Sequence, residues 1–183
     1  YRFKPEVIVR DMHPDYLSSG FADELASEFT RPVVKVQHHH AHIASVMAEN
    51  QWPLGGRAIL GIALDGSGFG TDGSIWGGEF LLADYLGFER IAHFDAIAMP
   101  GGNQAIREPW RNAFAQLITH FGWDRVERRY PDLELVRFLE RKPLQVLSTM
   151  AERGLNSPLS SSVGRLFDAV AAALGLCREG VTY

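Results

Sequence analysis

The most constraining feature of the sequence is a nearly unbroken apolar run, Ala58–Leu64, that leads directly into a glycine-rich segment. A short apolar run bounded by turn residues is typical of a strand that is buried on both faces. The next nine residues, DGSGFGTDG at 65–73, contain four glycines, and more strand-forming sequence follows them. The sequence therefore predicts a buried strand that ends in a glycine-rich loop.

Short strands and amphipathic helices surround this run. β-branched and apolar clusters predict further strands at residues 7–9, 33–36, 74–82 and 91–98. Apolar residues at helical spacing predict helices at 17–29, from the polar block 37–40 to Met47, and at 110–121, 133–139, 144–150 and 163–174. Residues 1–183 thus form one partial α/β domain, β-rich over 1–100 and helical over 103–176. We expect this domain to be truncated at its C-terminus.

Composition excludes several classes of protein. The chain has 183 residues, of which 46% are hydrophobic, and its formal net charge is −4. The chain therefore lacks the overall positive charge that would attract nucleic acid without sequence specificity. No apolar stretch reaches the ~20 residues that a membrane-spanning helix needs. Its one cysteine, Cys177, excludes an internal disulfide framework and a cysteine-based zinc ribbon, so we expect a cytoplasmic protein.

The densest local signal is Gln37-His38-His39-His40-Ala41-His42, which holds four of the seven histidines. If this block opens a helix, His38 and His42 form an i,i+4 pair on one face, with Cβ atoms ~5–6 Å apart, so both imidazoles can bind one metal ion. The alternative is a purely structural junction between a strand and a helix. For His39 and His40, packing or supporting hydrogen bonds are the favoured roles.

A third metal ligand has to come from outside the histidine block. A zinc protease of the HExxH type would carry Glu after the first histidine, and this chain has His39 there. Asp65, at the expected end of the apolar strand, is the candidate ligand because a buried strand holds a carboxylate rigidly. An ordinary turn-forming role in the Asp-Gly pair explains it equally well.

The glycine-rich segment Gly66–Gly70 can expose backbone N–H groups to an anion such as a phosphate. It is neither a Walker loop nor a dinucleotide fingerprint, because no GK[ST] follows and the next element is a strand. A plain β-hairpin with glycine turns is the competing interpretation.

Two later segments carry further candidates. Arg107 and Arg111 flank a helix start after Pro100-Gly101-Gly102, and arginine binds carboxylates and phosphates through two hydrogen bonds. Solvated or carboxylate-paired arginines would look the same in sequence. Asp168 lies early in the Ser-capped helix at 163–174, where it is either solvated or an acceptor for a ligand hydroxyl.

Four segments together, VQHHHAHIAS, ALDGSGFGTDGSIWGGEF, MPGGNQAIREPWR and NSPLSSSVGRLFDAVAAALG, closely resemble the C-terminal Kae1-like domain of the HypF carbamoyltransferases of [NiFe]-hydrogenase maturation. The resemblance covers essentially all 183 residues. It implies an actin-like, ribonuclease H-like (ASKHA) α/β lobe with a helical insertion, in which a nucleotide binds between two lobes.

The resemblance also implies specific site residues. The family's HxxxH pair falls on His38 and His42, an Asp of the following strand matches Asp65, and a further Asp ligand is expected beyond Tyr183. The metal would be Fe or Zn. The implied nucleotide contacts are Gly66, Ser67, Gly68 and Gly70 in the glycine-rich segment and Gly164 and Asp168 in the GxxFD segment.

The activity implied by the resemblance is carbamoyl transfer. Carbamoyl phosphate and ATP, the latter with Mg, give carbamoyl-adenylate, and the carbamoyl group passes to the C-terminal cysteine of the partner HypE to become a cyanide ligand. This chain would serve the transfer step, because the cysteine-rich zinc modules and the adenylate-forming domain of the family are not in it. The sequence identifies no general base, and Cys177 is more consistent with packing than with catalysis.

Two alternatives remain, one of them enzymatic and the other noncatalytic. One is a tRNA threonylcarbamoyl-transfer protein of the same superfamily, although REPWR and the doubled glycine segment argue against it. The other is a noncatalytic nucleotide-binding module that regulates a partner, for which the histidine block would have no purpose. We expect neither nucleic acid nor membrane as a partner.

Overall fold

The computed structural model describes residues 4–180 and divides them into two compact units. Unit 1 runs up to Ala63 and also includes Gly68–Gly73 and Glu79–His93. Unit 2 comprises Leu64–Ser67, Ser74–Gly78 and the chain from Phe94 onward. The boundary between the units thus runs through two long strands, β3 (Ile59–Phe69) and β4 (Ile75–Ala83).

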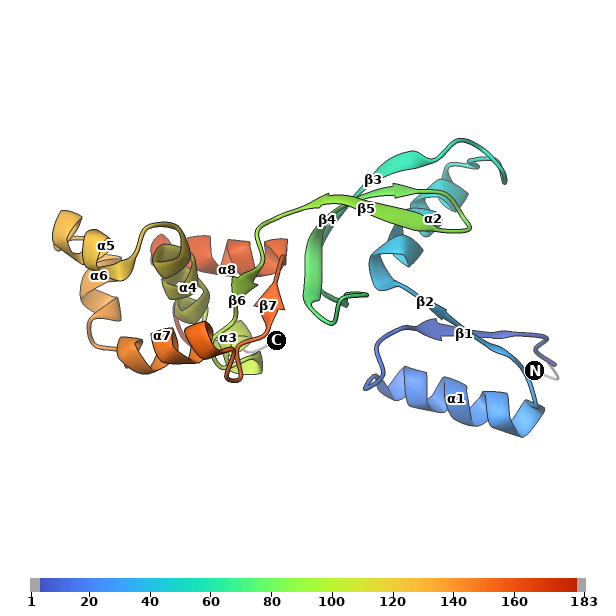
Figure 1. Cartoon of the computed structure of the whole chain (residues 1–183), viewed down its shortest axis with the longest axis horizontal. Helices are drawn as coiled ribbons and strands as arrows, with labels where there is room; N and C mark the ends of the chain where they lie inside the picture. The colour runs from blue at the N-terminus through green and yellow to red at the C-terminus, as the bar shows by residue number, and fades with distance from the viewer. Residues whose placement is uncertain (1–3, 181–183) are drawn as a thin grey trace. The chain divides into compact units, whose positions relative to one another are not determined.

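Unit 1 begins with a β-α-β arrangement. Strands β1 (Ile8–Asp11) and β2 (Val33–Val36) pair in parallel, and the connecting helix α1 (Leu17–Phe29) packs along them (Figure 1). Helix α2 (His38–Glu49) follows β2 after one residue. That residue, Gln37, caps the helix, because its side-chain oxygen accepts a hydrogen bond from the backbone N–H of His40 at 2.9 Å.

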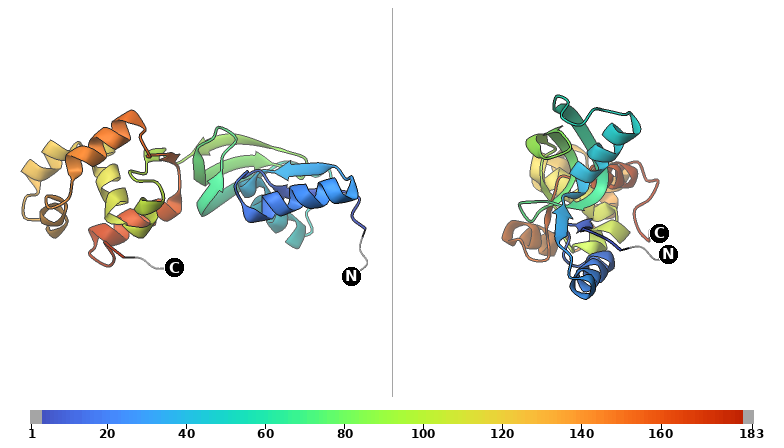
Figure 2. Two further views of the ribbon diagram at one scale, coloured as in Figure 1. Left: turned by 90° about the horizontal axis from the view of Figure 1, so that it is seen from below. Right: turned by 90° about the vertical axis from the view of Figure 1, so that its right-hand side faces the viewer.

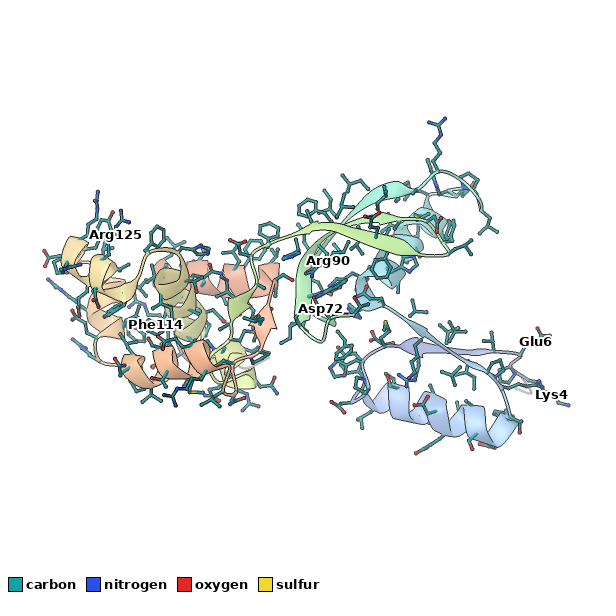
Figure 3. All side chains as sticks on the ribbon, viewed as in Figure 1. Lys4, Glu6, Asp72, Arg90, Phe114 and Arg125 are labelled. Carbon is teal, nitrogen blue, oxygen red and sulfur yellow. The ribbon has the colours of Figure 1, made fainter. Side chains whose placement is uncertain are left out.

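A buried ion pair lies in the antiparallel hairpin of β4 and β5 (Phe88–His93). The carboxylate of Glu79 is fully buried and accepts a 2.6 Å hydrogen bond from Arg90, which also contacts Asp72 at 3.1 Å. Figure 3 shows Arg90 and Asp72 directed toward each other. Arg90 therefore ties the glycine turn at 70–73 to the hairpin.

Unit 2 is mainly helical, and its helices form the yellow-green to red part of the ribbon (Figure 2). Three short strand segments lie beside them: the start of β4, β6 (Ile97–Ala98) and β7 (Leu159–Ser160). The helices are α3 (Asn103–Arg107), α4 (Trp110–His120), α5 (Trp123–Arg129), α6 (Glu134–Leu139), α7 (Leu144–Arg153) and α8 (Val163–Ala173).

Two packing clusters hold unit 2 together. Large side chains of α4, α6 and α7 form one core, made of Trp110, Phe114, Leu139 and Leu147. Helix α4 also packs against α8 through the small buried residues Ala113, Ala169 and Ala172, which allow the two helix backbones to approach closely. The helical character predicted for the second half of the chain is confirmed.

The structure corrects several sequence predictions. Strand β3 continues to Phe69, so most of the predicted glycine loop is strand and only the residues around the 70–73 turn connect it to β4. The predicted burial on both faces is wrong, because one face of β3 is exposed, with Leu60 and Ile62 each 56% accessible. Strand β3 also lies at one end of the strand order β3-β4-β7-β6. The predicted strand at 91–98 is interrupted after His93. Helices α3 and α5 lie within the predicted helical region but were not predicted as separate helices, and β7 was not predicted.

Candidate metal centre

His38 and His42 lie one turn apart on α2, and their ring nitrogens converge. Their Nε2 atoms are 3.2 Å apart, and the ring planes are nearly perpendicular at 85°. A tetrahedral Zn²⁺ with Zn–N bonds of ~2.0–2.1 Å holds two imidazole nitrogens ~3.3 Å apart. The two donor atoms are therefore already at the separation that a shared metal ion requires.

Asp65 on β3 completes a set of three potential ligands. One ligand atom from each of His38, His42 and Asp65 lies within 4.8 Å of the other two. Two imidazole nitrogens and one carboxylate oxygen are a common protein donor set for Zn²⁺ and for nonhaem Fe²⁺. These residue types fit the metal that the sequence predicts, although Asp65 lies within the strand and not at its end.

Asp11 supports the histidine pair and was missed in the sequence. Its Oδ2 lies 2.8 Å from Nδ1 of His38, and its Oδ1 accepts a 2.7 Å hydrogen bond from the backbone N–H of His13. Burial by itself raises the pKa of Asp11, but the hydrogen bonds from His13 and His38 outweigh it and hold the pKa below its ordinary value. The carboxylate is therefore ionised at neutral pH.

The two intervening histidines have supporting roles, as predicted. His39 is fully buried, and its Nδ1 lies 3.2 Å from the side-chain amide nitrogen of Gln37. His40 is also buried, with Nε2 2.7 Å from the carbonyl oxygen of Asp84 and its ring packed against Phe88. These contacts fix the first turn of α2, and with it the orientation of His38.

Gly68 allows β3 to approach the histidine block. A Cβ atom on Gly68 would lie 2.5 Å from His39 and 3.0 Å from His38, which is too close for any side chain without a shift of these rings. The amide group of Gln37 also donates to the carbonyl oxygen of Phe69 at 3.2 Å. In this part of the glycine-rich segment, the absence of a side chain is thus required for packing, whatever the segment binds.

Helix α8 begins against β3 at Gly66. The hydroxyl of Ser162 lies 2.7 Å from the carbonyl oxygen of Gly66 and accepts the backbone N–H of Arg165, which caps the helix. A Cβ on Gly164 would lie 2.8 Å from the Cα of Gly66. Two of the predicted nucleotide contacts, Gly66 and Gly164, are therefore in backbone contact with each other.

Asp168 lies one turn into α8, with 17% of its side chain exposed. It is 2.7 Å from the guanidinium group of Arg165, although the approach is not aligned as a hydrogen bond. Burial raises the pKa of Asp168, and Arg165 only partly offsets this effect. Such a carboxylate can accept a hydrogen bond from a ligand hydroxyl.

The two candidate arginines differ in their surroundings. Arg111 pairs with Glu108, lies 3.3 Å from the carbonyl oxygen of Pro100, and stacks over Trp110 with 5.0 Å to the ring centroid. This pairing agrees with the structural alternative for Arg111. Arg107 is exposed at the end of α3.

Comparison with known families identifies the class of protein: the chain belongs to the Kae1-like domains of the carbamoyltransferase family. The family model described as "Carbamoyltransferase, Kae1-like Domain, second subdomain" matches residues 61–183, and the model described as "HypF Kae1-like domain" matches residues 1–49. Because these models cover most of the sequence, the chain belongs to the HypF carbamoyltransferase family. The α/β fold class expected from the sequence is confirmed.

Individual relatives agree with this assignment. The chain is 44% identical over 180 residues to carbamoyltransferase HypF of Rhodobacter capsulatus, a match that covers 98% of this chain and 23% of the relative. It is 37% identical to a probable carbamoyltransferase HypF of Methanocaldococcus jannaschii, covering 96% of this chain and 22% of that protein. The chain thus spans about a quarter of the length of these relatives.

Solved structures show the same fold. A full-length HypF in a phosphate- and nucleotide-bound form superposes with a TM-score of 0.84 at 39% identity, over 99% of this chain and 26% of that one. HypF of T. kodakarensis gives 0.79 at 37% identity, over 97% and 23%. The tRNA-directed and noncatalytic alternatives are not favoured by these comparisons. No helix in residues 4–180 has the length and apolar character needed to span a membrane.

Proposed function

We propose that this chain forms the metal- and nucleotide-binding part of a HypF transfer site in the cytoplasm. At this site, the C-terminal cysteine thiolate of HypE would attack the carbamoyl carbon of carbamoyl-adenylate, which is made from carbamoyl phosphate and ATP. The new C–S bond replaces the C–O bond to the phosphate, and AMP leaves. The main support is the convergence of His38, His42 and Asp65 in a chain of the HypF family.

His38, His42 and Asp65 would hold Zn or Fe, with further positions available to substrate oxygens or water. When bound, the metal supplies Lewis-acid polarisation of a carbamoyl or phosphoryl oxygen. The protein's own contribution is to orient both imidazoles toward one point. Asp11 and the cap at Gln37 perform this task for His38.

The nucleotide would lie along the glycine-rich part of β3 and the start of α8. Backbone N–H groups of Ser67, Gly68 and Gly70 are the proposed phosphate donors, with Mg accompanying ATP. The N–H of Gly66 donates to Oδ1 of Asp65 at 2.6 Å, so Gly66 would contact the nucleotide through its exposed backbone and not through this hydrogen bond. Gly164 keeps α8 close to this strand, and Asp168 is the proposed acceptor for a nucleotide hydroxyl.

The acceptor thiolate comes from the partner in this proposal. Cys177 is partly buried and follows α8, far along the chain from the histidine block, so it is not assigned a chemical role. Of the two candidate anion contacts, exposed Arg107 is the better placed to meet a ligand, because Arg111 is already paired with Glu108. No general base is assigned.

The proposal is tested by metal analysis and calorimetry on the wild type, His42→Ala and His120→Ala. We expect near-stoichiometric metal in the wild type and in His120→Ala, whose exposed histidine lies on α4, and loss of metal in His42→Ala. AMP should bind the metal-loaded protein more tightly than the metal-free protein.

A second experiment tests the transfer itself. Mass spectrometry of HypE, incubated with this chain and enzymatically formed carbamoyl-adenylate, should detect a carbamoylated C-terminal cysteine. Equal metal content in His42→Ala and wild type would contradict the proposal.

A further inference from the structure

The pairing of β1 with β2 brings an acidic residue next to the histidine block. Asp11 is the last residue of β1 and lies opposite Val36, two residues before His38. Its carboxylate reaches His38 Nδ1 at 2.8 Å, whereas the other ring nitrogen of His38 faces His42. Nothing in the local sequence around the histidines supplies this contact.

The contact determines which nitrogen of His38 carries the proton. An ionised carboxylate only accepts hydrogen bonds, so Nδ1 of His38 must be the donor, and Nε2 of the neutral ring then keeps its lone pair. That Nε2 is the atom 3.2 Å from Nε2 of His42. In the neutral ring, Nε2 is therefore the nitrogen that can serve as a ligand atom.

We infer that Asp11 is a positioning residue that presents Nε2 of His38 to the metal. This inference rests on the metal site proposed above and adds a residue to it. Carboxylate–histidine–metal arrangements of this kind orient the ring and increase the basicity of the ligating nitrogen. Asp11 would therefore act through His38 and would not touch the metal.

Asp11 is itself held in a fixed geometry. The backbone N–H of His13 binds its Oδ1 at 2.7 Å, and Arg10 donates to its carbonyl oxygen at 2.8 Å. Arg10 in turn pairs with Asp23 on α1 at 2.8 Å, which ties the end of β1 to the helix. The side chain of Asp11 is only 18% exposed. A carboxylate that is fixed through Oδ1 can hold an imidazole against Oδ2 in one orientation.

The test compares Asp11→Asn with Asp23→Asn. Both remove one carboxylate from unit 1, and both affected residues contact Arg10, but only Asp11 contacts His38. The amide introduced by Asp11→Asn can donate to Nδ1, which favours the wrong tautomer of His38. We expect Zn²⁺ affinity, measured by competition with a chromophoric chelator, to fall about 10- to 100-fold in Asp11→Asn and to change less than about twofold in Asp23→Asn.

A second measurement needs no metal. Long-range ¹H–¹⁵N spectra report which ring nitrogen of His38 is protonated. We expect a protonated Nδ1 in the wild type and in Asp23→Asn, and a population protonated at Nε2 in Asp11→Asn. The Co²⁺-substituted variant should also show an altered visible d–d spectrum, which a purely structural role of Asp11 would leave unchanged.

The outcomes separate the two proposals. Wild-type Zn²⁺ affinity in Asp11→Asn, or an unchanged His38 tautomer, would overturn the role of Asp11 alone. Absence of Zn²⁺ binding to the wild-type chain would overturn the proposed metal site, and the role of Asp11 with it. Circular dichroism of both variants establishes that the comparison is made between folded proteins.

Discussion

At the scale of single residues, a buried ion pair fixes the geometry of the hairpin formed by β4 and β5. Glu79 has no solvent exposure and pairs with Arg90, whose other contact, Asp72, lies in the turn after β3. Removing one partner of such a pair leaves the other charge buried and unpaired in a region of low dielectric constant. The exposed pair of Arg137 and Asp132 has no such cost, because water replaces the lost partner.

Arg90→Leu should therefore lower the free energy of unfolding by about 3–5 kcal/mol. Arg137→Leu is the matched control, and its effect should stay below about 1 kcal/mol. Urea titration followed by circular dichroism measures both. Similar effects of the two substitutions would contradict the structural role assigned to Glu79 and Arg90.

The raised pKa of Asp168 predicts a specific dependence on pH. An acid whose folded-state pKa lies above its unfolded value of 3.8 opposes folding once it ionises, and this penalty disappears below 3.8, where both states are protonated. As the pH rises from below 3.8 to neutrality, the wild type should lose stability relative to Asp168→Asn. Unfolding titrations of both proteins across this range provide the measurement, and a constant difference would contradict the assigned environment.

The histidine pair was predictable from the sequence, whereas Asp11 was not. His38 and His42 are four residues apart, so the helix alone brings their rings together. Asp11 is 27 residues from His38, and only the parallel pairing of β1 with β2 joins them. A motif search near the histidines cannot detect a contact that depends on strand pairing.

At the scale of elements, glycines in β3 serve as contact points for two helices. Gly68 meets the start of α2, and Gly66 meets the start of α8. The sequence interpretation treated these glycines as a loop, because glycine is usually a turn residue and its packing partners lie far away in the chain. Glycine is required at these positions because two helices approach the strand closely. The backbone does not have to turn there, so the strand continues through both glycines.

Two helical glycines allow a direct test of this packing. Gly164→Ala places a Cβ 2.8 Å from the backbone of Gly66, so we expect a loss of about 1–3 kcal/mol in unfolding free energy. Gly20→Ala, in α1, meets no atom within 4 Å and should instead gain about 0.5–1 kcal/mol from its better helix propensity.

Both effects are measurable by urea titration with far-ultraviolet circular dichroism, which follows the helix signal. A stabilising Gly164→Ala would mean that α8 can move away from β3 at little cost. In that case Gly164 would be a helix-start glycine without a packing role.

At the scale of the whole molecule, several large apolar side chains among the described residues are more than half exposed. On β3, Leu60 and Ile62 are both 56% accessible, and Leu17 on α1 is 93% accessible. Contiguous exposed apolar residues normally mark a surface that another part or another molecule covers. The apolar run at Ala58–Leu64 has the pattern of a strand covered on both faces, and here one face of β3 is open.

This exposure should dominate the solution behaviour of the chain. The double substitution Leu60→Thr with Ile62→Thr places β-branched residues suited to a strand on the open face and removes apolar surface from it. Because both side chains are more than half exposed, the free energy of unfolding should fall by no more than about 1 kcal/mol. Sedimentation velocity should show less self-association, and the fluorescence of a bound apolar dye should decrease.

The control for the open face of β3 is a substitution on its covered face. Ala63 follows Ile62 in the strand and is buried, so Ala63→Thr adds a larger, polar side chain inside the protein. This variant should destabilise the chain without reducing dye binding, because it leaves Leu60 and Ile62 exposed. If the double variant associates as strongly as the wild type, surfaces other than β3 must drive the association, and the exposed residues of α1, beginning with Leu17, would be the next to substitute.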